Sequence, residues 1–364
     1  MPYPEEAEGF MINELGKYQD FKKQSFKLKT FGEYDVDIKI ECCGVCGSDV
    51  HTITGGWGES PTPICVGHEV VGKVIKVGDK VSHVKVGDRA GCGAQVWACL
   101  KCGNCKSDNE NYCPEQVDTY GAPYPKEACP NETISQGGYS SHIRVHEYFV
   151  FPIPDAIPSH LAAPMLCAGL TVWSPLVRAK VGPGKQVAIV GMGGLGHFAV
   201  MWANALGAEV TVISHSPEKK DDAMKLGAKN FVLNNEEGWA KPLAFKFDFV
   251  LNAADMTHTF EIDNYISILK VNCQFHQVGL PDEALPSMKA QQFMPNGSSI
   301  GASHIGNRPE CLAMLKLAAE KKLFPMVETM PISEKSCAEA VERVKNNKVH
   351  YRFTLTDFDK AFGN

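Results

Sequence analysis

The sequence predicts an α/β protein with two domains, one β-rich and one built on a doubly wound parallel sheet. A chain of 364 residues is too long for one ordinary hydrophobic core. Residues 1–157 contain short, closely spaced β-branched runs, whereas the chain from Lys185 onward alternates apolar strands with helical segments. A glycine-rich turn joins the first strand of this second pattern to its first helix.

The β-rich domain contains its clearest strand pattern in "YDVDIKIEC", residues 34–42. Apolar side chains at every second position alternate with Asp37, Lys39 and Glu41, which is the period of a half-buried strand. The runs "EVVGKVIKVG" and "VKVGDRAG" are further short strands that end at glycine. We expect a small barrel or a folded sheet, with the three charged side chains on its exposed face.

The second half predicts a parallel sheet over residues 158–304. Strand, helix and strand in repetition imply helices on both faces of such a sheet. The strands are expected at 186–191, 209–214, 230–234, 247–252, 272–279 and 298–304, with helices near 194–206, 217–226 and 258–269.

The C-terminal segment, residues 305–364, returns to the first pattern. It holds helices near 309–321 and 334–346 and a last strand, "HYRFTLT". We expect this segment to complete the domain formed by residues 1–157.

The turn "VAIVGMGGLGH" predicts a dinucleotide-binding site. The spacing G-x-G-x-x-G between a strand and a helix lets the backbone approach a pyrophosphate, which the N–H groups of the helix N-terminus then bind. The glycine pattern alone is a weak signal, but the further strand–helix alternations support it. The residues that carry the prediction are Gly191, Gly193, Gly194, Leu195 and Gly196.

The end of the next strand, "EVTVIS", favours NADP over NAD. An NAD site usually has Asp or Glu there, about 20 residues after the glycines, to bind the ribose hydroxyls. This chain has Ser214, followed by His215 and then Lys219 in "HSPEKK", so hydrogen-bond donors and positive charge are available for a 2′-phosphate. The alternative is that 217–222 is only the solvated start of a helix, whose acidic residues dilute that charge.

Two sets of side chains predict metal sites. Cys99, Cys102, Cys105 and Cys113 follow the spacing C-x2-C-x2-C-x7-C. Four thiolates on one loop can close a tetrahedral shell around a structural zinc, and an iron–sulfur cluster is the alternative.

The second set is dispersed: Cys46, His68 with the adjacent Glu69, and Cys167. Two sulfurs and one imidazole would leave a fourth position open, as in a catalytic zinc site. Each of these residues is a weak signal alone, since an isolated Cys or His is more often a core residue.

Composition excludes several other classes. A net charge of −6 argues against a nucleic-acid partner and an anionic membrane surface, and no apolar run reaches the roughly 18 residues of a membrane span. The N-terminal residues of the sequence lack the features of a secretory signal. The fourteen cysteines are better interpreted as thiols and metal ligands than as disulfide partners. We therefore expect a cytoplasmic protein.

At this point the motifs resemble a known family. The segments "CGVCGSDVH", "GHEVVGKV", "GGYSSH", "LCAGLTVWSPL" and "VGMGGLGH", with the four-cysteine segment, look like the zinc-dependent medium-chain alcohol dehydrogenases. Within them the chain is most similar to the NADP-preferring cinnamyl alcohol dehydrogenase type, including fungal members. The resemblance covers nearly the whole chain. It implies a GroES-like catalytic domain, a Rossmann cofactor domain and a homodimer.

The resemblance also implies roles for single residues. Cys46, His68 and Cys167 would be ligands of a catalytic zinc, and Glu69 either a fourth ligand or a neighbour of the ligands. Asp49 would orient His68. Ser48 and His51 would pass the alcohol proton outward. The residues expected to bind the cofactor beyond the glycine turn are Thr171, Val278, Gly279, Ser299, Ile300 and Arg352.

The resemblance implies reversible, NADP(H)-linked interconversion of a primary alcohol and its aldehyde by hydride transfer. Trp57, Trp97, Tyr120 and Phe293 are candidates for a pocket that would suit aromatic or medium-chain substrates. The alternatives are an NAD-linked polyol or secondary-alcohol dehydrogenase of the same superfamily and a non-catalytic zinc-binding relative. Two departures stand out: His215 replaces an arginine of some fungal relatives, and the 121–137 segment is unusually long.

Overall fold

The computed structural model describes residues 5–130 and 133–363. The chain divides into two compact units: unit 1, formed by Met1–Cys167 with Asn307–Asn364, and unit 2, formed by Ala168–Gly306. The first segment of unit 1 extends to Cys167, and α3 (Ser159–Ala162) and η3 (Ala163–Leu166) near its end contact strands of unit 1. Ala162 of α3 and all four residues of η3 are buried there, and this packing cannot be read from the local pattern.

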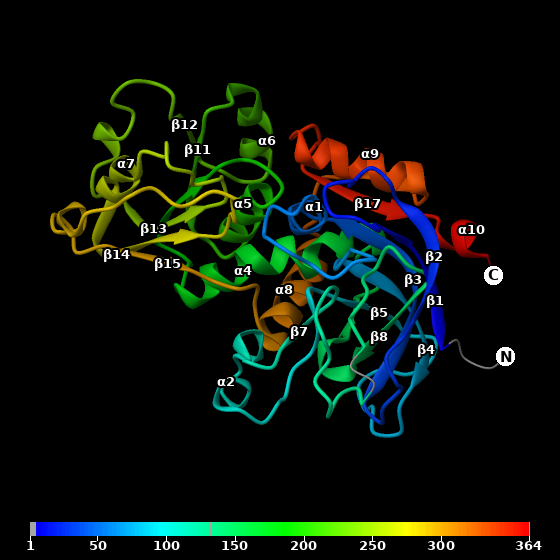
Figure 1. Ribbon diagram of the computed structural model, residues 1–364. Helices are drawn as coiled ribbons and strands as arrows, with labels where there is room; N and C mark the ends of the chain where they lie inside the picture. Colours follow the sequence, from blue (N-terminus) through cyan, green and yellow to red (C-terminus); the bar gives the residue numbers. More distant parts are fainter. Residues whose placement is uncertain (1–4, 131–132, 364) are drawn as a thin grey trace. The chain divides into compact units, whose positions relative to one another are not determined.

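Unit 2 is built on a six-stranded parallel sheet with the order β12-β11-β10-β13-β14-β15 (Figure 1). This is the order of a Rossmann fold, in which the chain starts at the centre and builds outward in both directions. The expected strands are present, although β14 begins earlier and β15 is shorter than its pattern suggested. Their bounds are β10 Gln186–Val190, β11 Glu209–Ser214, β12 Asn230–Leu233, β13 Phe247–Asn252, β14 Leu269–Gln277 and β15 Ser299–Ala302.

The helices of unit 2 follow from the crossovers between these strands. The connection from β10 to β11, which contains α5, and the connection from β13 to β14, which contains α7, run in opposite directions across the sheet, so right-handed crossovers place α5 and α7 on opposite faces. Side chains of α7 pack against Val250 and Phe275 in one apolar core. The helices are α4 Ala168–Arg178, α5 Gly196–Ala205, α6 Lys220–Lys225 and α7 Ile262–Ser267, with short 3-10 turns η4 Pro217–Lys219, η5 Lys241–Leu243 and η6 Ala290–Phe293.

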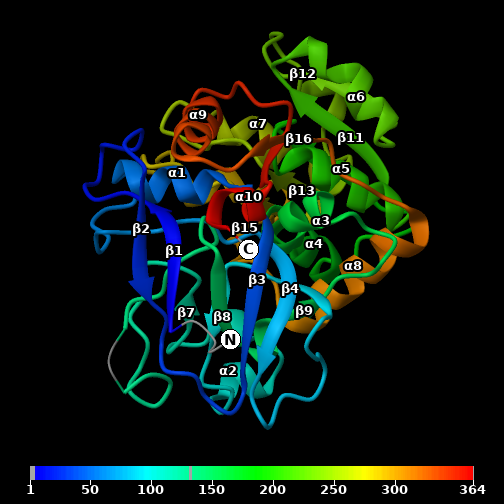
Figure 2. The ribbon, with the colours of Figure 1, turned by 90° about the vertical axis from the view of Figure 1, so that its right-hand side faces the viewer.

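Unit 1 is built on a seven-stranded sheet with the order β16-β17-β3-β4-β5-β9, in which β8 also pairs with β3. The C-terminal strand β17 is antiparallel to β3, with Phe353 opposite Val45, so the end of the chain completes the sheet that its beginning forms. Figure 2 shows β3, β4 and β8 side by side. These strands are β3 Asp35–Val45, β4 Val70–Val77, β5 Arg89–Cys92, β8 His142–His146, β9 Phe151–Pro152, β16 Val327–Pro331 and β17 Arg352–Thr356.

Smaller elements surround this sheet. The pairs β1–β2 and β6–β7 form two-stranded antiparallel sheets. The strands are β1 Glu6–Met11, β2 Lys22–Lys27, β6 Gln95–Trp97 and β7 Val117–Asp118; the helices are α1 Gly47–Thr54, α2 Gly103–Lys106, α8 Arg308–Lys321, α9 Glu334–Lys345 and α10 Phe358–Phe362, with η1 Glu110–Tyr112 and η2 Glu147–Phe149.

The expectation for the charged face of β3 is wrong at Asp37. This carboxylate is only 1 % exposed, because it accepts two hydrogen bonds from Arg144 of β8, at 2.7 Å from Nε and 2.9 Å from Nη2. A buried charge is tolerated where an opposite charge and good hydrogen-bond geometry offset its lost hydration. The partner lies on another strand, so the alternation within β3 does not reveal it.

Within the described residues, no single helix is long and apolar enough to cross a membrane. One bent pair, Ser159–Leu166 with Ala168–Arg178, meets the requirement by length and composition alone.

Candidate active site

Unit 1 brings together the dispersed set that the sequence singled out. One ligand atom each from Cys46, His68, Glu69 and Cys167 lies within 4.8 Å of the others, and all four residues are buried. Cys46 caps the N-terminus of α1 directly after β3, the adjacent His68 and Glu69 precede β4, and Cys167 ends the unit. The antiparallel pairing of β3 with β4 brings the first two positions together, although the site spans more than 100 residues.

Asp49 organises this cluster through three hydrogen bonds. Its Oδ2 accepts from the backbone N–H of Cys46 at 2.9 Å, and its Oδ1 accepts from the N–H of Gly67 at 3.1 Å. Oδ1 also lies 3.0 Å from Nδ1 of His68. A carboxylate can only accept, so this contact places the ring proton on Nδ1 and leaves the Nε2 lone pair directed at the cluster.

Glu69 and Arg352 form a buried ion pair at the same cluster, between Oε1 and Nη2. Burial raises the pKa of Glu69 to about 7, although the Arg352 guanidinium opposes that rise. Burial disfavours the charged form of Arg352, but Glu69, Cys46 and Cys167 together outweigh it and leave the pKa of the guanidinium above its ordinary value. Arg352 therefore contacts Glu69 of the candidate metal site. The sequence had suggested Arg352 only as a cofactor-binding residue.

The donor set fits a zinc ion. Two sulfurs, one imidazole nitrogen and a carboxylate oxygen are the atoms that zinc prefers. His68 Nε2 lies 3.1 Å from Cys167 Sγ, close to the separation of about 3.6 Å that tetrahedral Zn–N and Zn–S bonds imply. Oε2 of Glu69 is buried and has no hydrogen-bond partner among the described residues, which leaves it available to a cation.

The four-cysteine segment folds into a second cluster. The sulfur of Cys113 lies 3.5 Å from that of Cys99, and the sulfur of Cys105 lies 3.5 Å from Cys102 and 4.0 Å from Cys99. A tetrahedral Zn–thiolate site requires about 3.8 Å between sulfurs, so the loop is shaped for such an ion. Among the described residues, no two cysteines are joined by a disulfide bond.

The expected relay residues lie on α1. Ser48 and His51 are three positions apart, so they share one face of the helix. The Ser48 hydroxyl lies 3.7 Å from Cys46 Sγ. The ring of His51 is stacked on Trp57, and the ring of Tyr120 lies 5.6 Å from that of His68.

The two other pocket candidates belong to the apolar cores of the two units. Trp97 is buried in the main core of unit 1, and Phe293 packs against the core of unit 2.

In unit 2 the glycine turn has the geometry that a dinucleotide requires. Gly191 follows β10 with φ +83°, in the left-handed region that favours glycine. A Cβ on Gly196 would lie 1.9 Å from the carbonyl oxygen of Gly191, so this glycine permits close packing of helix on strand. A Cβ on Gly193 would meet nothing within 4 Å, which leaves room for a ligand. The residues present therefore fit a pyrophosphate at the start of α5.

The other expected cofactor residues of unit 2 lie in three kinds of position. Ser214 ends β11, and Val278 and Gly279 follow β14, so these three stand at the carboxyl ends of their strands, where such sheets bind ligands. Ser299 and Ile300 instead begin β15 and pair with Gln274 and Phe275, further back along the sheet. Of the remaining three, Thr171 lies in α4, His215 is exposed just after β11, and Lys219 ends η4.

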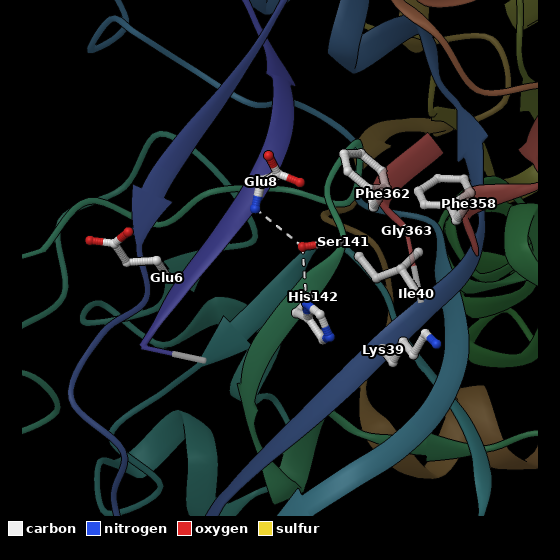
Figure 3. Close-up of a pocket in the computed structure, with 9 residues that line it drawn as sticks. All are labelled: Glu6, Glu8, Lys39, Ile40, Ser141, His142, Phe358, Phe362 and Gly363. Atoms are coloured by element: carbon white, nitrogen blue, oxygen red, sulfur yellow. Dashed lines mark hydrogen bonds between the residues drawn. The ribbon is translucent and has the colours of Figure 1, made fainter. Parts of the chain in front are cut away.

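The pocket in Figure 3 is a different feature of unit 1. Ser141 is hydrogen-bonded within the protein here: its hydroxyl accepts from the N–H of Glu8 at 3.1 Å and contacts Nδ1 of His142 at 2.9 Å. It contains none of the expected site residues. Its lining is Glu6, Glu8, Lys39, Ile40, Ser141, His142, Phe358, Phe362 and Gly363.

Comparisons with known proteins agree with this architecture. Residues 32–155 match the family model of the alcohol dehydrogenase GroES-like domain, and residues 194–320 match that of the zinc-binding dehydrogenases. The chain is 44 % identical to NADP-dependent alcohol dehydrogenase 6 of Saccharomyces cerevisiae, over 100 % of this chain and 99 % of that protein.

Two solved structures are also similar to the chain. A cinnamyl alcohol dehydrogenase of Sorghum bicolor superposes with a TM-score of 0.89 at 35 % identity, covering 96 % of this chain and 97 % of its own. The cinnamyl alcohol dehydrogenase of Helicobacter pylori complexed with NADP(H) superposes with a TM-score of 0.87 at 31 % identity, covering 96 % and 98 %.

The fold and the two cysteine-bearing clusters define a zinc-binding dehydrogenase. The chain belongs to the zinc-dependent medium-chain alcohol dehydrogenases, in the branch of the NADP-dependent, cinnamyl alcohol dehydrogenase-like enzymes.

Proposed function

We propose that this enzyme interconverts primary alcohols and aldehydes with NADP(H), and that its substrates are aromatic or medium-chain alcohols and aldehydes. The observation that carries the proposal is the buried cluster of Cys46, His68, Glu69 and Cys167 in a chain of this family. When bound, zinc supplies a Lewis acid for the substrate oxygen, and the nicotinamide supplies or accepts the hydride.

The residues around the cluster prepare it for this chemistry. Cys46, His68 and Cys167 hold the zinc, and Asp49 keeps His68 in the tautomer whose Nε2 can bind a metal. Glu69 is held by Arg352 through one oxygen, so its other oxygen can ligate zinc while a substrate is absent. Ser48 and His51, on the same face of α1, carry the alcohol proton away from the buried site.

A second zinc stabilises the loop of Cys99, Cys102, Cys105 and Cys113, giving two zinc ions per chain. The sulfur separations of 3.5–4.0 Å support this ion. With four protein ligands it has no position left for substrate, so its role is structural.

The cofactor is NADP rather than NAD because the acid that would bind two ribose hydroxyls is absent at the end of β11. Ser214 occupies that place and accepts a hydrogen bond from the N–H of Ser216 at 3.1 Å. The nearby His215, Lys219 and Lys220 supply donors and positive charge for the 2′-phosphate.

The enzyme works in the cytoplasm as a homodimer. The fourteen cysteines, all among the described residues, form no disulfide bond, which suits a reducing compartment. The strand β15 is an edge of the unit 2 sheet, and Met294 in the segment before it is 77 % exposed, which supports a partner at this edge. Light scattering on the purified protein tests the dimer, and a fluorescent fusion tests the compartment.

The deciding experiment measures a panel of alcohols and aldehydes with NADP(H) and with NAD(H), for the wild type and for Cys46→Ser. We expect turnover with NADP(H), its loss in Cys46→Ser, and unchanged NADPH binding in that variant. Cys42→Ser is the matched control, because Cys42 is buried in β3, the strand that directly precedes Cys46, but lies outside the cluster. Full activity of Cys46→Ser would refute the catalytic zinc site, and faster turnover with NAD would refute the cofactor assignment.

A further inference from the structure

One feature next to the site is a flat stack between two aromatic side chains of unit 1. The imidazole of His51 and the indole of Trp57 have ring centroids 4.8 Å apart and planes only 7° from parallel. This is the offset-stacked arrangement that aromatic pairs favour. Trp57 is nevertheless 44 % exposed, so burial in a core does not account for its position.

The backbone after α1 creates this stack. The helix ends at Thr54, and Gly55 takes the left-handed conformation with φ +79°. The N–H of Gly55 then donates to the carbonyl of Thr52 at 3.1 Å, and the N–H of Gly56 donates to the carbonyl of His51 at 2.9 Å. These two bonds form a Schellman motif, which reverses the chain. The reversal returns residue 57 to the helix turn that carries His51.

We propose that Trp57 is a positioning residue that holds the imidazole of His51 in the orientation required for proton transfer. The proposal rests on the proposed function, in which His51 carries the alcohol proton. The stack covers one face of the imidazole and opposes rotation about its Cβ–Cγ bond, while the two ring nitrogens, at the edge of the ring, stay open to hydrogen bonds.

The same contact places an indole face next to the imidazole that carries the proton. During proton transfer His51 passes through the imidazolium state, and a cation above an indole face is attracted by the ring quadrupole. Tryptophan provides the strongest such face among the aromatic residues, and phenylalanine keeps the plane with a weaker one. Leucine at this position would remove both the plane and the quadrupole.

Trp57 could instead act only as a wall of the substrate pocket, and a double-mutant cycle separates the two roles. If Trp57 is only a pocket wall, it acts independently of His51, and the fold-decreases in kcat caused by the two substitutions multiply in the double variant. If Trp57 is a positioning residue, it acts only through His51, and replacing it causes no decrease in kcat once His51 has been replaced. The cycle consists of Trp57→Leu, His51→Gln and the double variant, with kcat and KM measured for one alcohol.

We expect Trp57→Leu to lower kcat about 2- to 12-fold, the range that corresponds to the worth of an aromatic pair, with a smaller change in KM. Trp57→Phe should retain at least half of kcat. In the His51→Gln background Trp57→Leu should cause no further loss. Two losses that multiply, or an unchanged kcat in Trp57→Leu, would overturn the proposal.

A matched control exists on the same unit. Tyr34 is exposed to a similar extent, 38 %, and is stacked on His146 with ring centroids 5.5 Å apart, but neither residue belongs to the site. Tyr34→Leu therefore removes an aromatic–histidine stack without touching the relay, and kcat should be unchanged.

Nuclear magnetic resonance of the protein without substrate gives a readout that does not depend on activity. Ring protons of His51 should be shifted upfield by the indole ring current, and this shift should vanish in Trp57→Leu and remain in part in Trp57→Phe. An unshifted His51 in the wild type would refute the stack itself. Failure of the proposed function would look different, since the wild type would then lack alcohol oxidation altogether.

Discussion

Replacing Asp49 by asparagine tests how the metal cluster is held. Asp49 is fully buried and accepts from two backbone N–H groups and from Nδ1 of His68. An asparagine keeps one acceptor oxygen and turns the other into an NH2 group. Whichever way the amide is oriented, this group faces a buried donor.

The magnitude follows from the two possible orientations. If the NH2 group faces the N–H of Cys46, a buried donor is left unsatisfied, at a cost of about 1–3 kcal/mol. If it faces His68, the ring must accept through Nδ1, which moves its proton to Nε2 and blocks the atom that binds the metal. We expect zinc affinity at this site to fall about 10- to 100-fold.

Competition with a chromophoric chelator measures the affinity of each zinc in Asp49→Asn and in the wild type. In Asp49→Asn, the zinc bound by Cys46, His68 and Cys167 should be removed at a lower chelator concentration than in the wild type. The zinc on the four-cysteine loop should be retained as in the wild type. Asp37→Asn is the control, because it changes a carboxylate buried in the same unit that contacts Arg144 instead of the cluster. Equal affinities in Asp49→Asn and the wild type would refute this reading of the hydrogen bonds.

Three further predictions concern the other sites. Cys105→Ser should lower the zinc content from about two to about one per chain by elemental analysis; two zincs in this variant would mean that the loop is not a metal site. Ser214→Asp should shift the ratio of kcat/KM for NADP and NAD toward NAD by about tenfold or more, because a carboxylate repels the 2′-phosphate; an unchanged ratio would place the phosphate elsewhere. Burial lowers the pKa of His276 to about 4, below the value of about 6.5 in an unfolded chain. The folded state therefore binds this proton less readily than the unfolded state, so the stability that depends on neutral His276 is present above pH 6.5 and is lost as the pH falls toward 4. Between pH 8 and pH 5 this loss amounts to about 2 kcal/mol, and His276→Gln should remove that part of the pH dependence in urea unfolding; equal slopes in both proteins would contradict it.

Much of unit 2 could be predicted because its signals are local. Each strand and helix carries its own periodicity, and the glycine spacing lies within a single turn. The four cysteines of the loop likewise fall within fifteen residues, so their common chemistry can be read directly. The Schellman motif after α1 has a local signal as well, two glycines directly after a helix, and it could have indicated the return of Trp57 to His51.

The remaining features depend on partners that are remote along the chain. His68 and Cys167 are 99 residues apart, and Glu69 and Arg352 are 283 apart. No spacing rule connects these residues: their residue types indicated a site formed by Cys46, His68, Glu69 and Cys167, the resemblance to a family gave the ligand roles, and Arg352 was expected at the cofactor. The contact of Arg352 with Glu69 was missed for this reason.

The sequence by itself determined the strands, the helices, the glycine turn and the cysteine loop, because neighbouring residues decide local conformation and local ligand spacing. Only the tertiary structure decided which charged side chains are buried, where unit 1 ends, and which side chains surround the cluster. The physical reason is desolvation. A charge such as Asp37 or Glu69 can leave water only where folding brings an opposite charge to it, and in this chain those partners, Arg144 and Arg352, come from distant strands.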